Sequence, residues 1–313
     1  MGSSPKIVIL LIIILATAIA IQSYNPLEES TQEEKGGRTN RITVKKTLQI
    51  PHNPKDSKPE IPWNTKIEEI RNNEDILKPQ AMRAPSSWYM LIDEPGYYEL
   101  TEDIINCTKE CGIYINASNV VLDGKGHIID GVYNESSGYG IYVDHATSVT
   151  IRNTKIQQWY SSGIYFDGSN NNTIYGNAIQ NILGYGIYFE DSGNNTICGN
   201  TMQNSWAGIY FWGLGTDNKI YDNTIQNNGY GICLHGSDNN KIYDNTIQNN
   251  DEYGIYFDGS DNNKIYNNSI ANDGMIFKES YNNIVENNTV NGTPLIYLEN
   301  KEDIVIEQQA GQI

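Results

Sequence analysis

Acidic side chains recur at one position of a repeated motif, where they have the chemistry of a cation site or an acid–base pair. Asp144, Asp167 and Glu190 each follow the tyrosine of a Gly-Ile-Tyr triplet by two residues. If the triplets lie on stacked strands, neighbouring carboxylates are about 5 Å apart. That spacing suits a bridging Ca²⁺ ion or two carboxylates acting as general acid and base. Asp is also frequent in turns, so a solvated turn is the alternative interpretation.

The tyrosines of the triplets form a candidate binding surface. A row of aromatic rings on a flat strand surface can stack on sugar rings or against a partner protein. Tyr also fits half-exposed strands and packs against its equivalents on neighbouring strands, so a purely structural role is the alternative. The candidate ligand-binding residues are Tyr142, Tyr165, Tyr188, Tyr210 and Tyr256.

A sequence repeat must position these side chains. Gly-Ile-Tyr, or a close variant of it, returns every 20 to 28 residues. Within a repeat, apolar residues alternate over a few positions between Gly, Asn, Asp and Ser, which indicates short strands joined by tight turns. One such unit cannot bury its own apolar side, so the repeats must stack as a solenoid. We predict an all-β, right-handed parallel β-helix of about nine coils.

Residues at equivalent positions of the repeats predict which side chains stack on one another in neighbouring coils. Two isoleucine columns predict internal aliphatic rows, and an asparagine column predicts a ladder of amides hydrogen-bonded from coil to coil at strand spacing. The first row is Ile164, Ile187, Ile209, Ile232 and Ile255, the second is Ile156, Ile179, Met202, Ile225, Ile247 and Ile270, and the ladder is Asn177, Asn200, Asn223, Asn245 and Asn268.

From about Ser87 to the C-terminus, the chain resembles the NosD-like family of right-handed parallel β-helix repeats, which overlaps the carbohydrate-binding and sugar-hydrolase β-helices. The resemblance rests on the triplets, on Pro95–Leu100, which looks like the family's entry strand, and on Ile113–Gly131, which looks like its first full turns. The resemblance implies the fold. It implies function only loosely, because the same coil serves lyases, epimerases, accessory factors and surface proteins.

The family name suggests copper, but the sequence does not support a copper site. The histidines are scattered, and no cluster of His, Cys and Met has the spacing of metal ligands. We therefore expect no cofactor, apart from calcium at the acidic column described above. The histidines are His52, His127, His145 and His235.

The four cysteines divide into two groups. Cys107 and Cys111 are close in the sequence, and a disulfide between them is plausible in an exported protein. Cys198 and Cys233 fall in different columns of the repeat, on different strands, which is poor geometry for a bond. We expect these two thiols to be free among outward-facing aromatic side chains.

Composition divides the chain into three parts. Residues 1–23 contain Lys6 and then an apolar run from Ile7 to Ile21, which predicts a signal peptide or an N-terminal membrane anchor. Residues 24–86 combine prolines with mixed charges and predict a flexible linker. Residues 87–313 form the predicted β-helix with its N-terminal cap. We expect an exported protein, extracellular or on the cell surface, and its eight Asn-x-Ser/Thr sequons are possible glycan sites.

The net charge of the predicted β-helix limits which partners it can bind. Residues 87–313 carry 9 basic and 28 acidic side chains, a net charge of −19. Such an acidic surface is unsuited to phosphate backbones, so we expect no nucleic acid partner. Solubility is the simplest role of the charge.

The main functional prediction is a cell-envelope protein with a binding or structural role toward polysaccharide or another surface protein. The first alternative is a polysaccharide-active lyase, epimerase or hydrolase that uses Asp144, Asp167 and Glu190. The acidic column continues with Trp212, His235 and Asp258, and we find no basic residue beside these acids, which weighs against a lyase. The second alternative, from the resemblance alone, is an accessory factor for metalloenzyme assembly.

Overall fold

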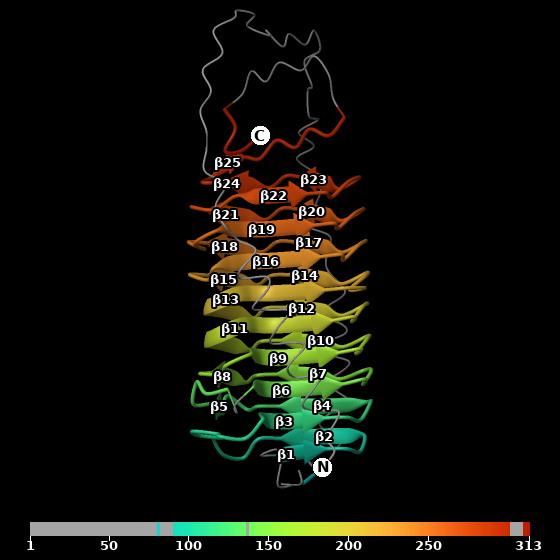
Figure 1. Cartoon of the computed structure of the whole chain (residues 1–313), viewed down its shortest axis with the longest axis vertical. Coiled ribbons are helices and arrows are strands. Elements are labelled where there is room, and N and C mark those ends of the chain that lie inside the picture. Colours follow the sequence, from blue (N-terminus) through green and yellow to red (C-terminus); the bar gives the residue numbers. More distant parts are fainter. Residues whose placement is uncertain (1–79, 82–89, 136–137, 301–308) are drawn as a thin grey trace, which may run out of the picture. The chain divides into compact units, whose positions relative to one another are not determined.

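The described part of the chain is an all-β solenoid. The structure is a computed structural model that describes residues 80–81, 90–135, 138–300 and 309–313. The strands of this part stack as successive coils, each a layer of the solenoid (Figure 1). The predicted parallel β-helix of about nine coils is therefore confirmed. The expected signal or anchor (1–23) and almost all of the expected linker (24–86) lie outside the described residues.

Each coil contributes strands to three walls, which we call faces I, II and III. Face II is a separate nine-stranded sheet, whereas faces I and III belong to one 16-stranded sheet because β11 and β13 run from one face into the other. Apart from the final hairpin, neighbouring strands are parallel. Each strand therefore lies on its equivalent in the preceding coil.

The strands of the three faces have the following bounds. Face I contains β1 (Met90–Ile92), β3 (Cys111–Ile115), β6 (Tyr139–Asp144), β9 (Ser162–Asp167), the second halves of β11 (Ala178–Glu190) and β13 (Thr201–Trp212), β16 (Tyr230–His235), β19 (Tyr253–Asp258) and β22 (Met275–Lys278). Face II contains β2 (Gly96–Glu99), β4 (Val120–Asp123), β7 (Thr150–Arg152), β10 (Thr173–Tyr175), β12 (Thr196–Cys198), β14 (Lys219–Tyr221), β17 (Lys241–Tyr243), β20 (Lys264–Tyr266) and β23 (Ile284–Glu286). Face III contains β5 (Ile128–Asp130), β8 (Lys155–Gln157), the first halves of β11 and β13, β15 (Thr224–Gln226), β18 (Thr246–Gln248), β21 (Ser269–Ala271), β24 (Thr289–Val290) and the antiparallel β25 (Thr293–Pro294).

The register of the strands places like residues on like residues. Ile187 pairs with Ile164 on one side and with Ile209 on the other, and all three are fully buried. Phenylalanines beside this row also stack, with the rings of Phe189 and Phe211 4.6 Å apart and 5° from parallel. Both predicted aliphatic rows are therefore confirmed, and they form one continuous core along the solenoid.

The predicted asparagine ladder is buried and hydrogen-bonded. At Asn223, the side-chain oxygen accepts from the backbone N–H of Asn200, and the side-chain nitrogen donates to Ile197 O, to Tyr221 O and to the side chain of Asn245, each at 3.0 Å. Two further ladders, which the sequence analysis did not identify, occupy other corners of the coil. One runs through Asn172, Asn195, Asn218, Asn240, Asn263 and Asn283, and the other through Ser205, Asn228, Asn250 and Asp273.

Half-buried and exposed asparagines instead turn the chain at the corners. Asn181, Asn204, Asn227 and Asn249 occupy one corner with φ between 54° and 56°. Asn tolerates this left-handed conformation better than most residues. The asparagine-rich turns of the repeat therefore follow from the geometry of the coil.

Side-chain amides also close the two ends of the described solenoid. At the start, Gln80 Nε2 donates to Pro95 O at 3.3 Å and Gln80 Oε1 accepts from Tyr98 Oη at 2.9 Å, although Gln80 lies in the segment expected to be linker. At the other end, Gln312 Nε2 donates to Met275 O at 2.6 Å, and Met275 N donates to Gln312 Oε1 at 2.8 Å. One glutamine thus satisfies a backbone donor and acceptor on the free edge of β22.

The predicted disulfide between Cys107 and Cys111 is wrong, because the structure contains both as free, buried thiols. Cys107 packs in the main core, whereas Cys111 lies in register with the outward-facing Tyr139. The two thiols therefore belong to different packing layers. Cys198 and Cys233 are free among tyrosines, as predicted. Among the described residues, no helix has the length and hydrophobicity needed to cross a membrane.

Candidate functional site on face I

Face I brings the predicted acidic column together. Asp144 pairs in register with Asp167, and Asp167 pairs with Glu190. The column then continues through Trp212, His235, Asp258 and Lys278. The order predicted from the sequence is confirmed, with Lys278 as an additional final member that forms a 3.0 Å ion pair with Asp258.

Each of the three acids accepts a hydrogen bond from a tyrosine of the preceding coil. Tyr142 Oη donates to Asp167 at 3.1 Å, and Tyr165 Oη donates to Glu190 at 2.5 Å. Tyr114 Oη donates to Asp144 in the same way. Hydroxyl donors thus satisfy acceptor oxygens of carboxylates that are stacked from coil to coil.

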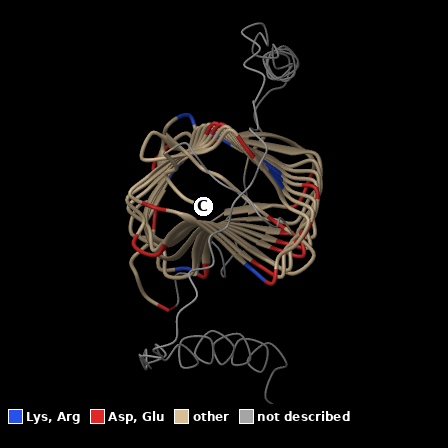
Figure 2. Cartoon of the chain, turned by 90° about the horizontal axis from the view of Figure 1, so that it is seen from above, with Lys and Arg blue, Asp and Glu red and all other residues tan. Residues whose placement is uncertain are grey.

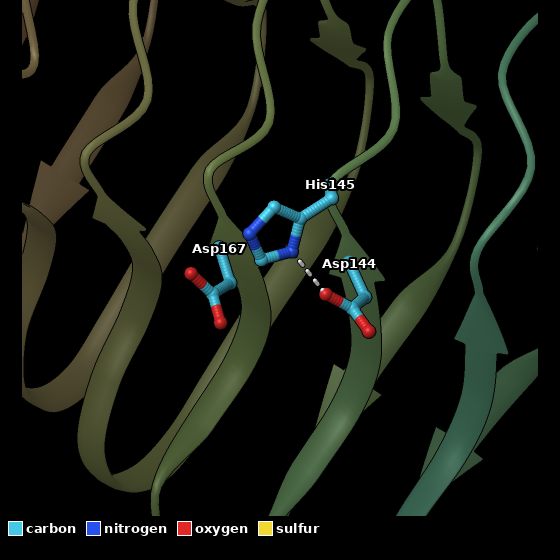
Figure 3. Close-up of side chains that lie close together, drawn as sticks. All are labelled: Asp144, His145 and Asp167. Atoms are coloured by element: carbon cyan, nitrogen blue, oxygen red, sulfur yellow. Dashed lines mark hydrogen bonds and ion pairs between the residues drawn. The ribbon is translucent and has the colours of Figure 1, made fainter.

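His145, one of the four histidines that look scattered in the sequence, completes a cluster at the start of this column. His145 Nδ1 lies 2.5 Å from Asp144 Oδ1, and the imidazole is close to Asp167 on the next coil (Figure 3). The φ of His145 is 49°, and its ring lies over Gly168 on the next coil. The hydrogen bond that His145 donates to the Asp144 carboxylate raises the pKa of His145 above its ordinary value. The expectation that no basic residue accompanies the acids is therefore wrong.

Glu190 is not part of this cluster. Ligand atoms of Asp144, His145 and Asp167 lie within 4.8 Å of one another. The Glu190 carboxylate instead accepts from Tyr165 and, at 3.3 Å, from Tyr188. A calcium site at the three acids remains a prediction. The structure brings two of the acids, Asp144 and Asp167, together with the imidazole of His145.

The tyrosine row is packed ring on ring. Tyr165 stacks between Tyr142 and Tyr188 at centroid distances of 4.9 and 5.0 Å, and only 7% of its surface is exposed. Tyr210 is equally buried. A second column supplies further rings, and the sequence analysis missed it because these tyrosines precede the glycine of the triplet. Its members are Tyr139, Tyr185, Tyr230 and Tyr253.

The exposed aromatic rings of face I are tryptophans. Trp206 and Trp212 lie on β13 on either side of Tyr210, and they are 46% and 44% exposed. Trp206 meets the ring of Tyr185 edge-on, whereas Trp212 stacks one face on the imidazole of His235 at 4.2 Å. From the sequence, Trp212 was predicted to be a member of the column without a role of its own, and Trp206 was not predicted to belong to a site.

Burial sets the ionisation of the tyrosines. It raises the pKa of Tyr139 and of Tyr185 to about 12. Burial, followed by the nearby carboxylate of Glu190, also raises the pKa values of Tyr165 and Tyr188. These hydroxyls therefore remain protonated throughout the neutral range, and those of Tyr165 and Tyr188 donate to Glu190.

The described residues do not fit a copper(I) site. Copper(I) prefers thiolate and thioether ligands. The four cysteines are buried, and burial raises the pKa of the Cys198 thiol to about 11 and that of Cys233 further, so these sulfurs are protonated. The Asp144–His145–Asp167 cluster offers one imidazole and two carboxylates, a harder set of donors.

Comparison with known proteins gives a family for this chain. The family described as "Periplasmic copper-binding protein (NosD)" matches residues 98–273. No curated protein matches the sequence of the chain.

Two solved structures show the same fold. The periplasmic alginate epimerase AlgG superposes with a TM-score of 0.52 and 16% identity, over 57% of this chain and 47% of the epimerase. DFA-IIIase from Arthrobacter chlorophenolicus A6, without its lid, superposes with a TM-score of 0.50 and 15% identity, over 67% of this chain and 60% of that enzyme. The chain thus spans about half to three fifths of these structures. Identity this low indicates a shared fold and nothing about chemistry.

Proposed function

This chain belongs to the family of periplasmic copper-binding proteins (NosD), and we propose that it is an exported β-helix protein that binds neutral polysaccharide along face I. Export is supported by the periplasmic description of the family and by the apolar run that follows Lys6. The binding role rests on a single observation, the exposure of Trp206 and Trp212 on one strand of face I.

The two tryptophans supply apolar surface suited to sugar rings. Aromatic rings with an apolar body and a polar edge are favoured where a ligand brings both kinds of group. Trp206 is not stacked face to face, and Trp212 stacks on His235 and Tyr210 but is still 44% exposed, so both rings retain surface for a ligand. The stacked tyrosines between them form a rigid floor that loses little conformational entropy on binding.

The polar groups of face I can bind the hydroxyl groups of a ligand, but they do not favour a ligand that carries acidic groups. Carboxylates such as Glu190 and Asp167 accept hydrogen bonds from sugar hydroxyls, but they repel a ligand that carries its own negative charge. The lysine of the column, Lys278, is already paired with Asp258. A neutral polysaccharide is therefore the ligand that this surface favours.

The proposal is tested by electrophoresis of the full chain through gels containing neutral polysaccharides such as xylan, mannan, starch or hydroxyethyl cellulose. We expect at least one of them to retard the protein, and Trp206→Ala and Trp212→Ala each to weaken binding by up to about tenfold. Tyr281→Ala is the matched control, because Tyr281 is exposed on a turn between β22 and β23. Absence of retardation in every gel, or equal binding by all variants, would overturn the proposal and favour a protein partner.

The Asp144–His145 pair supports a second candidate, a polysaccharide-active enzyme. An imidazole held by a carboxylate is a suitable general base, and Asp167 lies within reach as a partner acid. In this case purified protein releases new chain ends from a polymer, and His145→Ala and Asp167→Ala abolish the release while the circular dichroism spectrum is unchanged. Retardation without products favours the binding role, and products that persist in His145→Ala exclude this mechanism.

A further inference from the structure

Three lysines form a column on face II, away from the site described above. Lys219, Lys241 and Lys264 begin β14, β17 and β20 and pair in register, so they are about 4.8 Å apart along the solenoid. All three are exposed. In the end-on view, basic residues of successive coils coincide at one place on the wall (Figure 2).

These lysines are not neutralised by the acidic residues around them. Within the described residues, none of these three lysines forms an ion pair, in contrast to Lys125, Arg152 and Lys278. The aspartates of the turns beside the column bind backbone groups instead. Asp238 Oδ1 accepts from Asp261 N at 2.7 Å, and Asp261 Oδ1 accepts from Tyr281 N at 2.6 Å. Like charges stacked this closely repel one another, and an anion between them would relieve that repulsion.

The column borders a hollow of about 420 Å³. Its lining consists of Asn194, Asp217, Lys219, Asn239 and Lys241. Beside the lysines, Tyr221 and Tyr243 stack with their ring centroids 4.9 Å apart. The hollow therefore combines two ammonium groups with amides and one carboxylate.

We propose that this hollow binds an acidic saccharide. Its acidic group lies between Lys219 and Lys241, and its hydroxyls donate to Asp217 and exchange hydrogen bonds with Asn194 and Asn239. Asp217 favours a saccharide over a compact inorganic anion as the ligand. Its carboxylate repels an inorganic anion, but it accepts a hydrogen bond well from a sugar hydroxyl. The inference is independent of the proposed function, because it concerns face II and an acidic ligand, whereas the proposed function concerns face I and a neutral ligand.

The test is isothermal titration of the full chain with three acidic probes, namely oligogalacturonate, hyaluronan oligosaccharides and dextran sulfate, which distinguish carboxyl from sulfate groups. Methyl-esterified oligogalacturonate and dextran are the matched neutral probes, and poly-L-glutamate is the anion without sugar hydroxyls. We expect binding of an acidic saccharide that its neutral counterpart does not show. Binding to none of the acidic saccharides, or equally tight binding of poly-L-glutamate, would overturn the proposal.

Substitutions then locate the site. Lys219→Gln and Lys241→Gln are each expected to weaken binding roughly tenfold, as the loss of a charge-assisted hydrogen bond predicts. Lys155→Gln is the matched control, because Lys155 is an exposed lysine that begins β8 on another face. Asp217→Asn, which suits the left-handed backbone there, weakens binding if a hydroxyl donates to the carboxylate. Tighter binding by Asp217→Asn, or equal losses in Lys155→Gln, would contradict the assignment.

Discussion

Replacing Asn223 by alanine is expected to destabilise the solenoid strongly, although it deletes only one amide group. Asn223 is 1% exposed and lies in the middle of the ladder. Its side chain accepts from Asn200 N and donates toward Ile197 O, Tyr221 O and Asn245. The substitution leaves these partners in place, in a site closed to water.

The magnitude follows from counting the bonds that are lost. The Asn200 N–H loses its acceptor, and a buried unsatisfied donor costs about 1–3 kcal/mol. The two amide hydrogens of Asn223 account for two further bonds of about 1 kcal/mol each. We therefore expect the free energy of unfolding to fall by about 3–5 kcal/mol.

The assay is urea unfolding of the full chain followed by circular dichroism, with the slope compared between variants to check that the same surface unfolds. Gln226→Ala is the control, because Gln226 also forms an amide ladder, with bonds of 3.0 Å to Gln203 and 2.8 Å to Gln248, but on the outside of face III. Its loss is expected to cost about 0.5 kcal/mol. Equal effects of the two substitutions would refute the reasoning that buried amides hold the coils together.

Three further predictions concern the site and the core. Asp144→Asn returns the raised pKa of His145 toward its ordinary value of 6.5, as measured by NMR titration, and an unchanged pKa would show that the pair does not form in solution. Tyr139 and Tyr185, with pKa values of about 12, bind protons more tightly than the unfolded chain does, so stability that is complete below pH 10 falls as the pH rises toward 12. Phenolate absorbance that develops without loss of the β-sheet spectrum would contradict this prediction. Phe211→Ala opens the fully buried phenylalanine stack and lowers the free energy of unfolding by about 3–5 kcal/mol, and a loss below 1 kcal/mol in the urea assay would show that the stack collapses to fill the space.

The fold was predictable because the repeat determines both the alternation within a coil and the register between coils. Ile164, Ile187 and Ile209 share a column in the sequence, and identical neighbours in a parallel sheet must then lie on one another. The buried ladder at Asn223 followed from the same column argument. The disulfide was wrong because spacing along the chain says nothing about which side of a wall each thiol faces, and Cys107 and Cys111 lie in different layers.

The site was less predictable, because the exposure of a side chain and the geometry of a turn do not follow from which residues recur at one position of the repeat. His145 approaches Asp167 because its backbone is left-handed and its neighbour on the next coil is Gly168, and no periodicity marks such a turn. The tyrosine row was identified correctly, but its burial by a second tyrosine column was not. Trp206 and Trp212 carry the proposed binding, but tryptophan does not recur at their positions in neighbouring coils, where Trp212, for example, lies between Glu190 and His235, so a search for repetition passes over them.

The contact between Gln312 and β22 has a consequence for self-association. A parallel solenoid is a template, since the free edge of its last coil presents the backbone pattern that a new strand requires. The amide of Gln312 imitates one peptide group and occupies both the donor and the acceptor of Met275. While it does so, a strand from a second molecule cannot pair at that residue. One side chain thereby opposes edge-to-edge pairing at Met275, and its loss would leave this donor and acceptor open to a strand of a second molecule.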